Sequence, residues 1–433
     1  MALTAQQQAI QNQIDAFDSN TGTQILLSTL IRAIDAGDVR QGYADSAAFP
    51  TDSAFIGMIG FDDFDSSLRY VGRDLVAHKI DSAEIVAAGG GGVTLPAVDM
   101  RGTSYGYNIS GSAADMNKYS FTSDGNATDI GDFSVAVGPI TDATVESGSA
   151  GQSATAGYLF NYYGDGYSPG VSPASWSRKD AVKYPYATDA VSLTTATMLT
   201  APPGIGLYRG CVDAVGNRTY AYQLGGQDYG ASPAPASWVN IIGKFATATD
   251  ANATDVGDLA AVKGEMSGAS SSTHGYVAGG YNQAYTYTIE KVSFASDGNA
   301  TSVGNLVGIP GAPVEPRAHH TGGQSDTHGY ALSGTAPPTA TPVRADYVLS
   351  FPFASDTNAT NLGDQMNVSR TFHASTSSSS HIYSAGGHSP VAPGPSGSGT
   401  VNSIEKFDMT SNTGGTDVGD LSSATKNATG TAT

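Results

Sequence analysis

Short stretches of alternating apolar and polar residues follow one another from about residue 96 to the end of the chain, separated by turns of glycine, serine and asparagine. In two of these stretches a single polar residue separates two apolar ones, as between Tyr119 and Phe121 and between Val292 and Phe294. Successive side chains of a strand point to opposite faces of a sheet, so the alternation predicts short strands with a buried face. The 54 glycines agree with many tight turns. We therefore expect a mainly β fold.

The first 37 residues follow a helical pattern instead. Two segments, residues 4–17 and 23–34, place apolar side chains at helical spacing before a stop at Gly37. Isolated helices of this length are marginal in water, so their apolar faces need a partner. We expect residues 1–37 to be a helical attachment segment that packs on its own copies or on a larger assembly. Its expected assembly contacts are Ile10, Ile14, Phe17, Leu26, Leu27, Leu30 and Ile31.

A small second module is expected between residues 38 and 95. The segments 48–60 and 67–72 alternate apolar and polar residues around a polar turn, which predicts a β-hairpin. The run of glycines at 89–92 is typical of a flexible linker. The domain boundaries that follow are 1–37, 38–95 and 96–433.

One seven-residue motif recurs six times in the last part of the chain. It usually begins with lysine, continues with aromatic or apolar residues at alternate positions and ends with aspartate. Four copies continue as Asn-Ala-Thr and then a Gly-Asp or Gly-Asn pair. The pair Asp124-Gly125 predicts a two-residue hairpin turn, as does Asp297-Gly298. The six copies are 118–124, 183–189, 244–250, 291–297, 350–356 and 406–412.

A second motif, an apolar strand that contains tyrosine, lies between the copies of the first. Its six tyrosines are Tyr107, Tyr158, Tyr222, Tyr276, Tyr330 and Tyr383. The one that contains Tyr107 precedes every copy of the first motif, and the chain ends where a matching strand would be needed. An open ring of sheets would leave two unpaired edges. The offset therefore predicts a ring whose last sheet is completed by a strand from its start.

The order of these elements resembles the kelch repeat, which has a period of about 50 residues. The resemblance implies a six-bladed kelch-like β-propeller over residues 96–433, preceded by the small helical and β-hairpin module. The sequence departs from kelch where that family usually has a tryptophan after the turn, because Ala-Thr stands there. Ordinary kelch partners are therefore not carried over.

Long loops between the second and third strands of each blade share one face of the predicted propeller with the connections between blades. Loops of this length often carry function, and flat amphipathic rings bind sugars or proteins at low entropic cost. The alternative is that the tryptophan of the repeated Pro-Ala-Ser-Trp pins its loop to the blade. The candidate ligand-binding residues are Tyr162, Tyr163, Tyr167, Trp176, Tyr229, Trp238, Tyr281 and Tyr285.

Charge and composition exclude several classes of function. A net charge of -19 without a basic stripe argues against a binder of phosphate backbones. The single cysteine, Cys211, rules out a disulfide framework or a thiolate metal cluster. The start of the chain has no basic leader and no continuous apolar run, so we expect neither secretion nor a membrane span.

Histidines and aspartates at repeated positions raise the possibility of metal binding. His274, His328 and His381 each precede a blade tyrosine by two residues, and they serve either as metal ligands in the central channel or in packing. Turn aspartates such as Asp129 and Asp255 suit calcium or the capping of turns. We favour packing and turn roles, and expect no metal, no cofactor and no catalytic residues.

Two further resemblances suggest a biological setting. The hairpin resembles modules of tail-fibre and other virion proteins of bacteriophages, and the Asp-Gly-Asn-Ala-Thr-Asp-x-Gly-Asp repeats resemble propellers in structural proteins of marine phages. They imply a non-enzymatic virion protein, assembled in the host cytoplasm, that forms homo-oligomers. Its N-terminal segment would bind other virion proteins, and its propeller would meet a host surface glycan or protein. The alternatives are a purely structural component that packs between subunits and a glycan-active enzyme with a pair of carboxylates.

Overall fold

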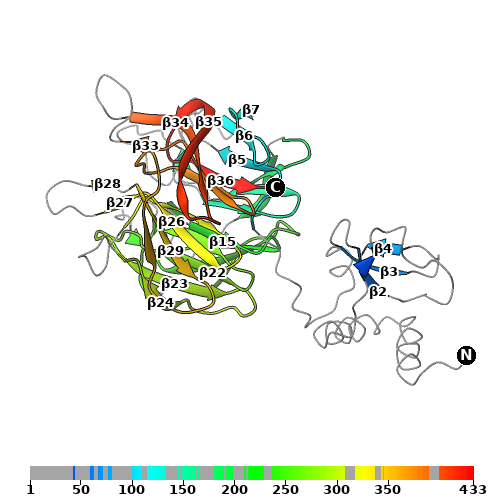
Figure 1. Cartoon of the computed structure of the whole chain (residues 1–433). Helices are drawn as coiled ribbons and strands as arrows, with labels where there is room; N and C mark the ends of the chain where they lie inside the picture. The colour runs from blue at the N-terminus through cyan, green and yellow to red at the C-terminus, as the bar shows by residue number, and fades with distance from the viewer. Residues whose placement is uncertain are drawn as a thin grey trace, which may run out of the picture. The chain divides into compact units, whose positions relative to one another are not determined.

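The computed structural model divides the chain into two compact units, Met1–Ala97 and Val98–Thr433 (Figure 1). The expected helices of residues 1–37, with all seven expected assembly contacts, lie outside the described residues. The residues that the structure describes are 42–43, 59–62, 67–71, 77–79, 100–109, 115–132, 145–146, 149–160, 163–164, 180–189, 192–197, 209–210, 213–228, 237–307, 317–336, 343–344, 346–389 and 399–433.

The first unit contains a small sheet in the order β1-β2-β3-β4. Strands β2 and β3 pair antiparallel, with Phe61 opposite Leu68, and β1 runs parallel to β2. The strands are β1 (Gly42–Tyr43), β2 (Ile59–Asp62), β3 (Ser67–Val71) and β4 (Ala77–Lys79).

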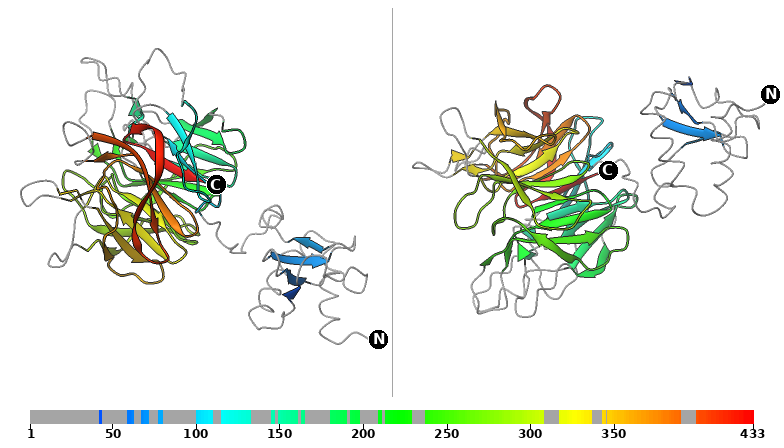
Figure 2. Two further views of the ribbon diagram at one scale, coloured as in Figure 1. Left: turned by 45° about the horizontal axis from the view of Figure 1, so that its top comes forward. Right: turned by 90° about the horizontal axis from the view of Figure 1, so that it is seen from below.

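The second unit is a six-bladed β-propeller, as the sequence predicts (Figure 2). In each blade four strands pair antiparallel, and the inner strands of successive blades contact one another around a central channel.

From the inner strand outwards, blade 1 is β36 (Thr429–Ala432), β5 (Tyr105–Ile109), β6 (Asp115–Ser120) and β7 (Thr128–Asp132). Blade 2 is β9 (Ser149–Gln152), β10 (Ala156–Phe160), β12 (Asp180–Pro185) and β13 (Ser192–Thr197). Blade 3 is β15 (Asp213–Gly216), β16 (Tyr220–Leu224), β19 (Ile241–Ala246) and β20 (Thr254–Asp258).

The remaining three blades follow the same plan. Blade 4 is β21 (Ser267–Ser270), β22 (His274–Ala278), β23 (Thr288–Ser293) and β24 (Thr301–Asn305). Blade 5 is β25 (Thr321–Gln324), β26 (His328–Leu332), β29 (Tyr347–Pro352) and β30 (Thr360–Asp364). Blade 6 is β31 (Ala374–Ser377), β32 (His381–Ala385), β34 (Gly399–Asp408) and β35 (Thr413–Thr425).

Short strand pairs form from the loops between the second and third strands of several blades. They are β8 (Val145–Glu146) with β11 (Tyr163–Gly164), β14 (Arg209–Gly210) with β17 (Gln227–Asp228) and β18 (Ser237–Trp238), β27 (Thr335–Ala336) with β28 (Val343–Arg344), and β33 (His388–Ser389) with β34. Of these strands, β8 and β14 join the pairs from the connections between blades.

The ring is closed by its two ends. Strand β36, the last in the chain, pairs antiparallel with β5, so that Thr431 lies opposite Tyr107 and Ala432 opposite Gly106. Blade 1 thus takes its inner strand from the C-terminus and its other three strands from the start of the propeller. The predicted closure is confirmed, because β36 pairs with the edge of β5 that would otherwise be open where the two ends of the ring meet.

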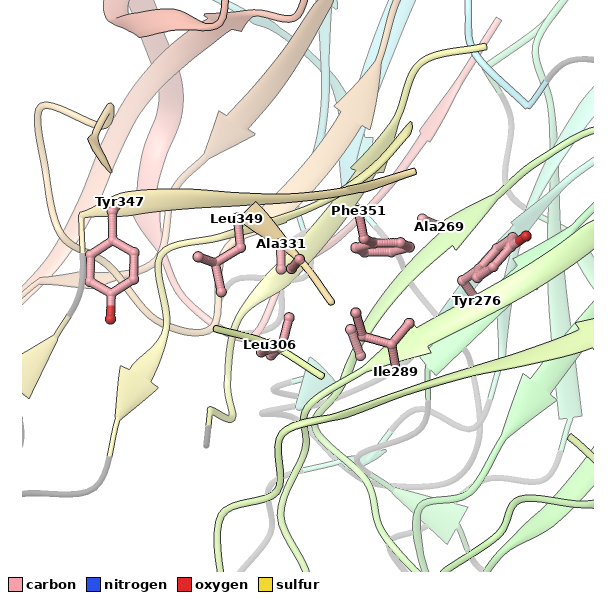
Figure 3. Packing of buried hydrophobic residues seen from close by; sticks show 10 residues of the cluster. Ala269, Tyr276, Ile289, Leu306, Ala331, Tyr347, Leu349 and Phe351 are labelled. Carbon is pink, nitrogen blue, oxygen red and sulfur yellow. The ribbon is translucent and has the colours of Figure 1, made fainter. Parts of the chain in front are cut away.

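The hydrophobic core consists of layers between neighbouring blades. Between blades 4 and 5, Tyr276, Ile289 and Leu306 meet Leu349 and Phe351 (Figure 3). The predicted burial of Tyr119 and Val292 is also confirmed. A glycine before the core tyrosine makes room for a ring of the neighbouring strand. In blade 2, a Cβ on Gly157 would lie 2.1 Å from the Tyr184 ring on the paired strand.

Hydrogen bonds between neighbouring blades account for the repeated Asn-Ala-Thr. The Asn299 side chain accepts a hydrogen bond from the backbone N–H of Asp258 in the preceding blade, at 3.0 Å, and Ala300 N–H donates back to Asp258 C=O at 2.8 Å. Asn358 and Asn126 make the equivalent side-chain bonds at 3.0 and 3.1 Å. The repeat therefore encodes contacts between blades.

The repeated aspartates Asp129 and Asp255 have local roles. They accept hydrogen bonds from the N–H groups two residues ahead, at 2.9 and 3.2 Å. Both lie within strands β7 and β20 at a shift of register, so they hold a β-bulge of their own strand and not the expected turn. The expected two-residue hairpins at Asp124-Gly125 and Asp297-Gly298 are wrong, because the connections span residues 121–127 between β6 and β7 and residues 294–300 between β23 and β24. The wider connection lets the Asp124 carboxylate reach the lysine of the neighbouring blade.

Lysine–aspartate pairs bridge five of the six blade junctions in the described part of the chain. The first residue of the seven-residue motif in one blade binds the last residue of the motif in the next, at 2.7 to 2.9 Å between Nζ and the carboxylate. The pairs are Lys118–Asp189, Lys183–Asp250, Lys244–Asp297, Lys291–Asp356 and Lys406–Asp124.

Candidate functional site at the mouth of the channel

Three of the predicted ligand-binding residues lie together on the face that carries the long loops. Trp238 comes from β18 of blade 3, while Tyr281 and Tyr285 come from the loop between β22 and β23 of blade 4. The Trp238 and Tyr281 rings are 5.7 Å apart, and those of Tyr281 and Tyr285 are 5.3 Å apart. All three side chains are half-buried, so part of each remains accessible to solvent.

Two rings from the connections between blades extend this group. His319 lies 6.5 Å from Tyr281, and Phe372 lies 4.3 Å from His319. We call Trp238, Tyr281, Tyr285, His319 and Phe372 the mouth cluster. Sequence reasoning missed His319 and Phe372, because the equivalent positions of the repeat carry different residue types and no motif marks them.

The backbone holds these two residues at the mouth of the channel. Glu265, His319, Phe372 and Asn427 precede the inner strands of their blades, and all four adopt left-handed φ angles of 55° to 57°. The N–H of each of the last three donates to the C=O of the preceding member, at 3.2, 3.2 and 2.8 Å. Left-handed residues other than glycine cost of order 1 kcal/mol and persist only where the surroundings hold them. The repeated conformation turns a row of side chains towards the channel mouth.

The channel below the mouth has a volume of about 200 Å³ and is lined by the inner strands of the blades. At the mouth, the Glu265 carboxylate binds Nε2 of His319 at 2.5 Å. His320 and His373 lie next to the mouth, and both are buried. His373 Nδ1 lies 2.6 Å from the Ser384 hydroxyl.

Burial keeps these two histidines neutral. It lowers the pKa of His320 to about 3, with a further contribution from the positive charge of Arg317. Burial, followed by the charge of Arg370, holds the pKa of His373 well below its usual range. The channel wall is therefore polar but uncharged at these two positions at neutral pH.

Most of the other candidate ligand-binding residues lie outside the part of the chain that the structure describes. Tyr163 lies in β11, and Tyr162, Tyr167, Trp176 and Tyr229 lie outside the described residues. Trp238 also lies opposite Gln227 in the pairing of β17 with β18. It therefore helps to fix its loop to the blade and also belongs to the mouth cluster.

The three repeated histidines lie at the opposite end of the blades from the mouth cluster. His274, His328 and His381 begin the second strands, and each Nδ1 lies 2.8 to 2.9 Å from a neighbouring hydroxyl. Each ring also contacts the tyrosine two residues on. None of them lines the channel, which confirms the packing and hydrogen-bonding role.

No protein-family model and no curated protein sequence matches the chain. Among the described residues, no group of three or more acidic, histidine or cysteine side chains has the arrangement of a metal site. No helix in that part of the chain is long and apolar enough to cross a bilayer.

Proposed function

We propose that this protein is a component of a phage virion, in a fibre, a tip or another exposed position, and that its propeller binds a host surface glycan. The supporting observation is the mouth cluster, in which five half-buried rings gather on one face. Such rings stack on sugars at low entropic cost. A surface protein is the second candidate ligand, because aromatic anchors also dominate protein interfaces.

The virion setting rests on the resemblance of the hairpin and of the degenerate kelch-like repeats to phage structural proteins. In this proposal, the N-terminal segment attaches the protein to other virion proteins, and the propeller is displayed outward. Homo-oligomers would present several mouth clusters at once, and this would raise the avidity for a repeated surface glycan.

The charges at the channel support binding without hydrolysis. Glycosidases generally use two carboxylates about 5 to 10 Å apart. Among the described residues that line the channel, Glu265 is the one carboxylate, and it is paired with His319. We therefore propose that the propeller recognises its ligand without cleaving it.

A glycan microarray and adsorption to host cells test this function. We expect Trp238→Ala and Tyr281→Ala each to weaken binding by about tenfold or more, because a central aromatic side chain contributes strongly to an interface. Tyr287→Ala is the matched control, since Tyr287 lies in the same blade, is 38% exposed and belongs to no part of the mouth cluster. Unchanged binding by both cluster variants, with their fold intact, would contradict the proposal.

A further inference from the structure

The junction between blades 5 and 6 departs from the rule that the other junctions follow. At the position of the lysine it has Ser350, and at the position of the aspartate it has Asn412. Blade 6, like blade 2, also lacks the Asn-Ala-Thr that follows the motif in the other four blades. Asn412 nevertheless keeps the left-handed backbone of Asp189 and Asp250, with φ of 53° against 52° and 49°. The turn that ends at Asn412 is therefore preserved, and the side chains of Ser350 and Asn412 account for the missing lysine–aspartate pair.

A pocket of about 320 Å³ opens at this junction, on the face opposite the mouth cluster. Tyr330 and Ser350 of blade 5 and Met409 of blade 6, all buried, line it together with the exposed Asn412. The turns between the first and second strands of both blades complete the lining, and they contribute Asp326 from blade 5 and Ser379 from blade 6. A volume near the lower end of the range for small-molecule pockets suits a ligand of one ring.

A buried arginine faces this pocket and is held in place by two contacts. Arg101 is 9% exposed, and its guanidinium binds the Asp326 carboxylate and donates to the C=O of Ser379 at 3.2 Å. The Asp326 side chain is 80% exposed, so its carboxylate retains lone pairs for a further donor. The amide of Asn412 and the hydroxyls of Ser350 and Thr410 add donors and acceptors around the same space.

The charges argue against an ammonium ligand. At the other junctions the lysine ammonium has a carboxylate beside it, and Lys118, Lys183 and Lys244 also lie over tyrosine rings, at 4.3 to 5.7 Å from the ring centroids. Here the equivalent carboxylate is replaced by an amide, and the negative charge of Asp326, the one acid among the described residues that line the pocket, is balanced by Arg101. An ammonium would be desolvated without a counter-charge of its own.

We propose that the junction of blades 5 and 6 is a binding site for a neutral, hydroxyl-rich ligand of monosaccharide size. The Arg101–Asp326 pair and Asn412 provide donors and acceptors for sugar hydroxyls, while Tyr330 and Met409 provide an apolar wall. The site is independent of the mouth cluster, because it lies at the opposite face and shares no residue with it.

Saturation-transfer NMR with the full-length protein tests the site, with methyl α-D-glucopyranoside, methyl β-D-galactopyranoside and N-acetyl-D-glucosamine as probes and n-butylamine as the cationic alternative. We expect at least one sugar to bind with a Kd of about 1 mM or tighter, and the amine not to bind. The variant Ser350→Lys/Asn412→Asp restores the lysine–aspartate pair of the other junctions and fills the pocket. It should remain folded and weaken sugar binding by at least about tenfold.

Two controls separate this site from other possibilities. Lys244→Ser/Asp297→Asn opens another junction, where Arg218 stands at the position of Asp326 and the Arg101–Asp326 pair is absent, so it should not alter the binding. In a Trp238→Ala background, which weakens the mouth cluster, filling the junction should still remove the remaining sugar signal, and this distinguishes the two sites. Binding by none of the three sugars, binding by the amine alone, or sugar binding that persists in the filled variant would each overturn the proposal.

Discussion

The two buried histidines beside the channel should make the stability of the propeller sensitive to acid. The unfolded chain takes up protons at an ordinary histidine pKa of about 6.5, while His320 in the folded protein does so only near 3. The unfolded state therefore binds more protons below pH 6.5, and the free energy of unfolding falls as the pH is lowered towards 3. The slope per histidine approaches about 1.4 kcal/mol per pH unit.

We expect His320→Met to reduce this slope, since Met266 occupies the equivalent position of blade 4. Urea unfolding at about pH 7 and about pH 5 measures the difference. The reciprocal variant Met266→His places a third imidazole at a site that is 1% exposed and should steepen the same dependence. Equal slopes in the wild type and the His320→Met variant would show that His320 takes up protons equally in the folded and unfolded states, which contradicts the lowered pKa.

At the scale of elements, the blades are held together by repeated polar contacts as well as by apolar layers. Among the lysine–aspartate pairs, Lys183 and Asp250 have the most similar side-chain exposures, 27% and 29%. The Tyr158 hydroxyl donates to the same carboxylate at 2.9 Å. Such a partly exposed pair contributes about 1 kcal/mol or less.

A double-mutant cycle with Lys183→Met and Asp250→Asn measures this contribution. We expect a coupling free energy of about 0.5 to 1 kcal/mol at low salt that shrinks as salt is added, because ions screen the pair. A cycle with Lys183→Met and Asp255→Asn serves as the control, since the Asp255 carboxylate binds the N–H of Gly257 within its own strand and should show no coupling. A coupling between Lys183 and Asp250 that is indistinguishable from the control would mean that the pair adds nothing to the junction.

For the whole propeller, the last strand decides whether the ring is closed. Thr431 and Ala432 are each 2% exposed, and Thr431 bonds the Tyr184 hydroxyl of blade 2. Deletion of residues 429–433 should remove the inner strand of blade 1 and expose an edge of β5. We expect this variant to lose cooperative thermal unfolding and to associate through the open edge, as measured by calorimetry and size-exclusion chromatography.

Deletion of residues 1–97 is the matched truncation at the other end. It removes the first compact unit but leaves every strand of the six blades, so the propeller should remain monodisperse and unfold cooperatively. A cooperative, monodisperse protein after the loss of residues 429–433 would show that the ring holds without its closing strand.

The sequence alone determined the fold class, the number of blades and the closure of the propeller. Periodic copies of one motif report how many units are present, and the strand with Tyr107 ahead of the first copy indicates which strand is shared. Alternation also predicted the burial of Tyr119 and Val292, because the faces of a strand follow from local geometry. These features depend on short stretches of chain, which sequence patterns describe well.

Only the tertiary structure decided which side chains meet between blades. The partner of Asn299 lies in another blade, so the repeated Asn-Ala-Thr was visible without its role. His319 and Phe372 carry no motif and come together through a shared backbone conformation. The pocket between blades 5 and 6 arises from Ser350 and Asn412, whose relation appears only when the blades are adjacent. Such contacts depend on the register between sheets, which is a property of the closed ring and of no single segment.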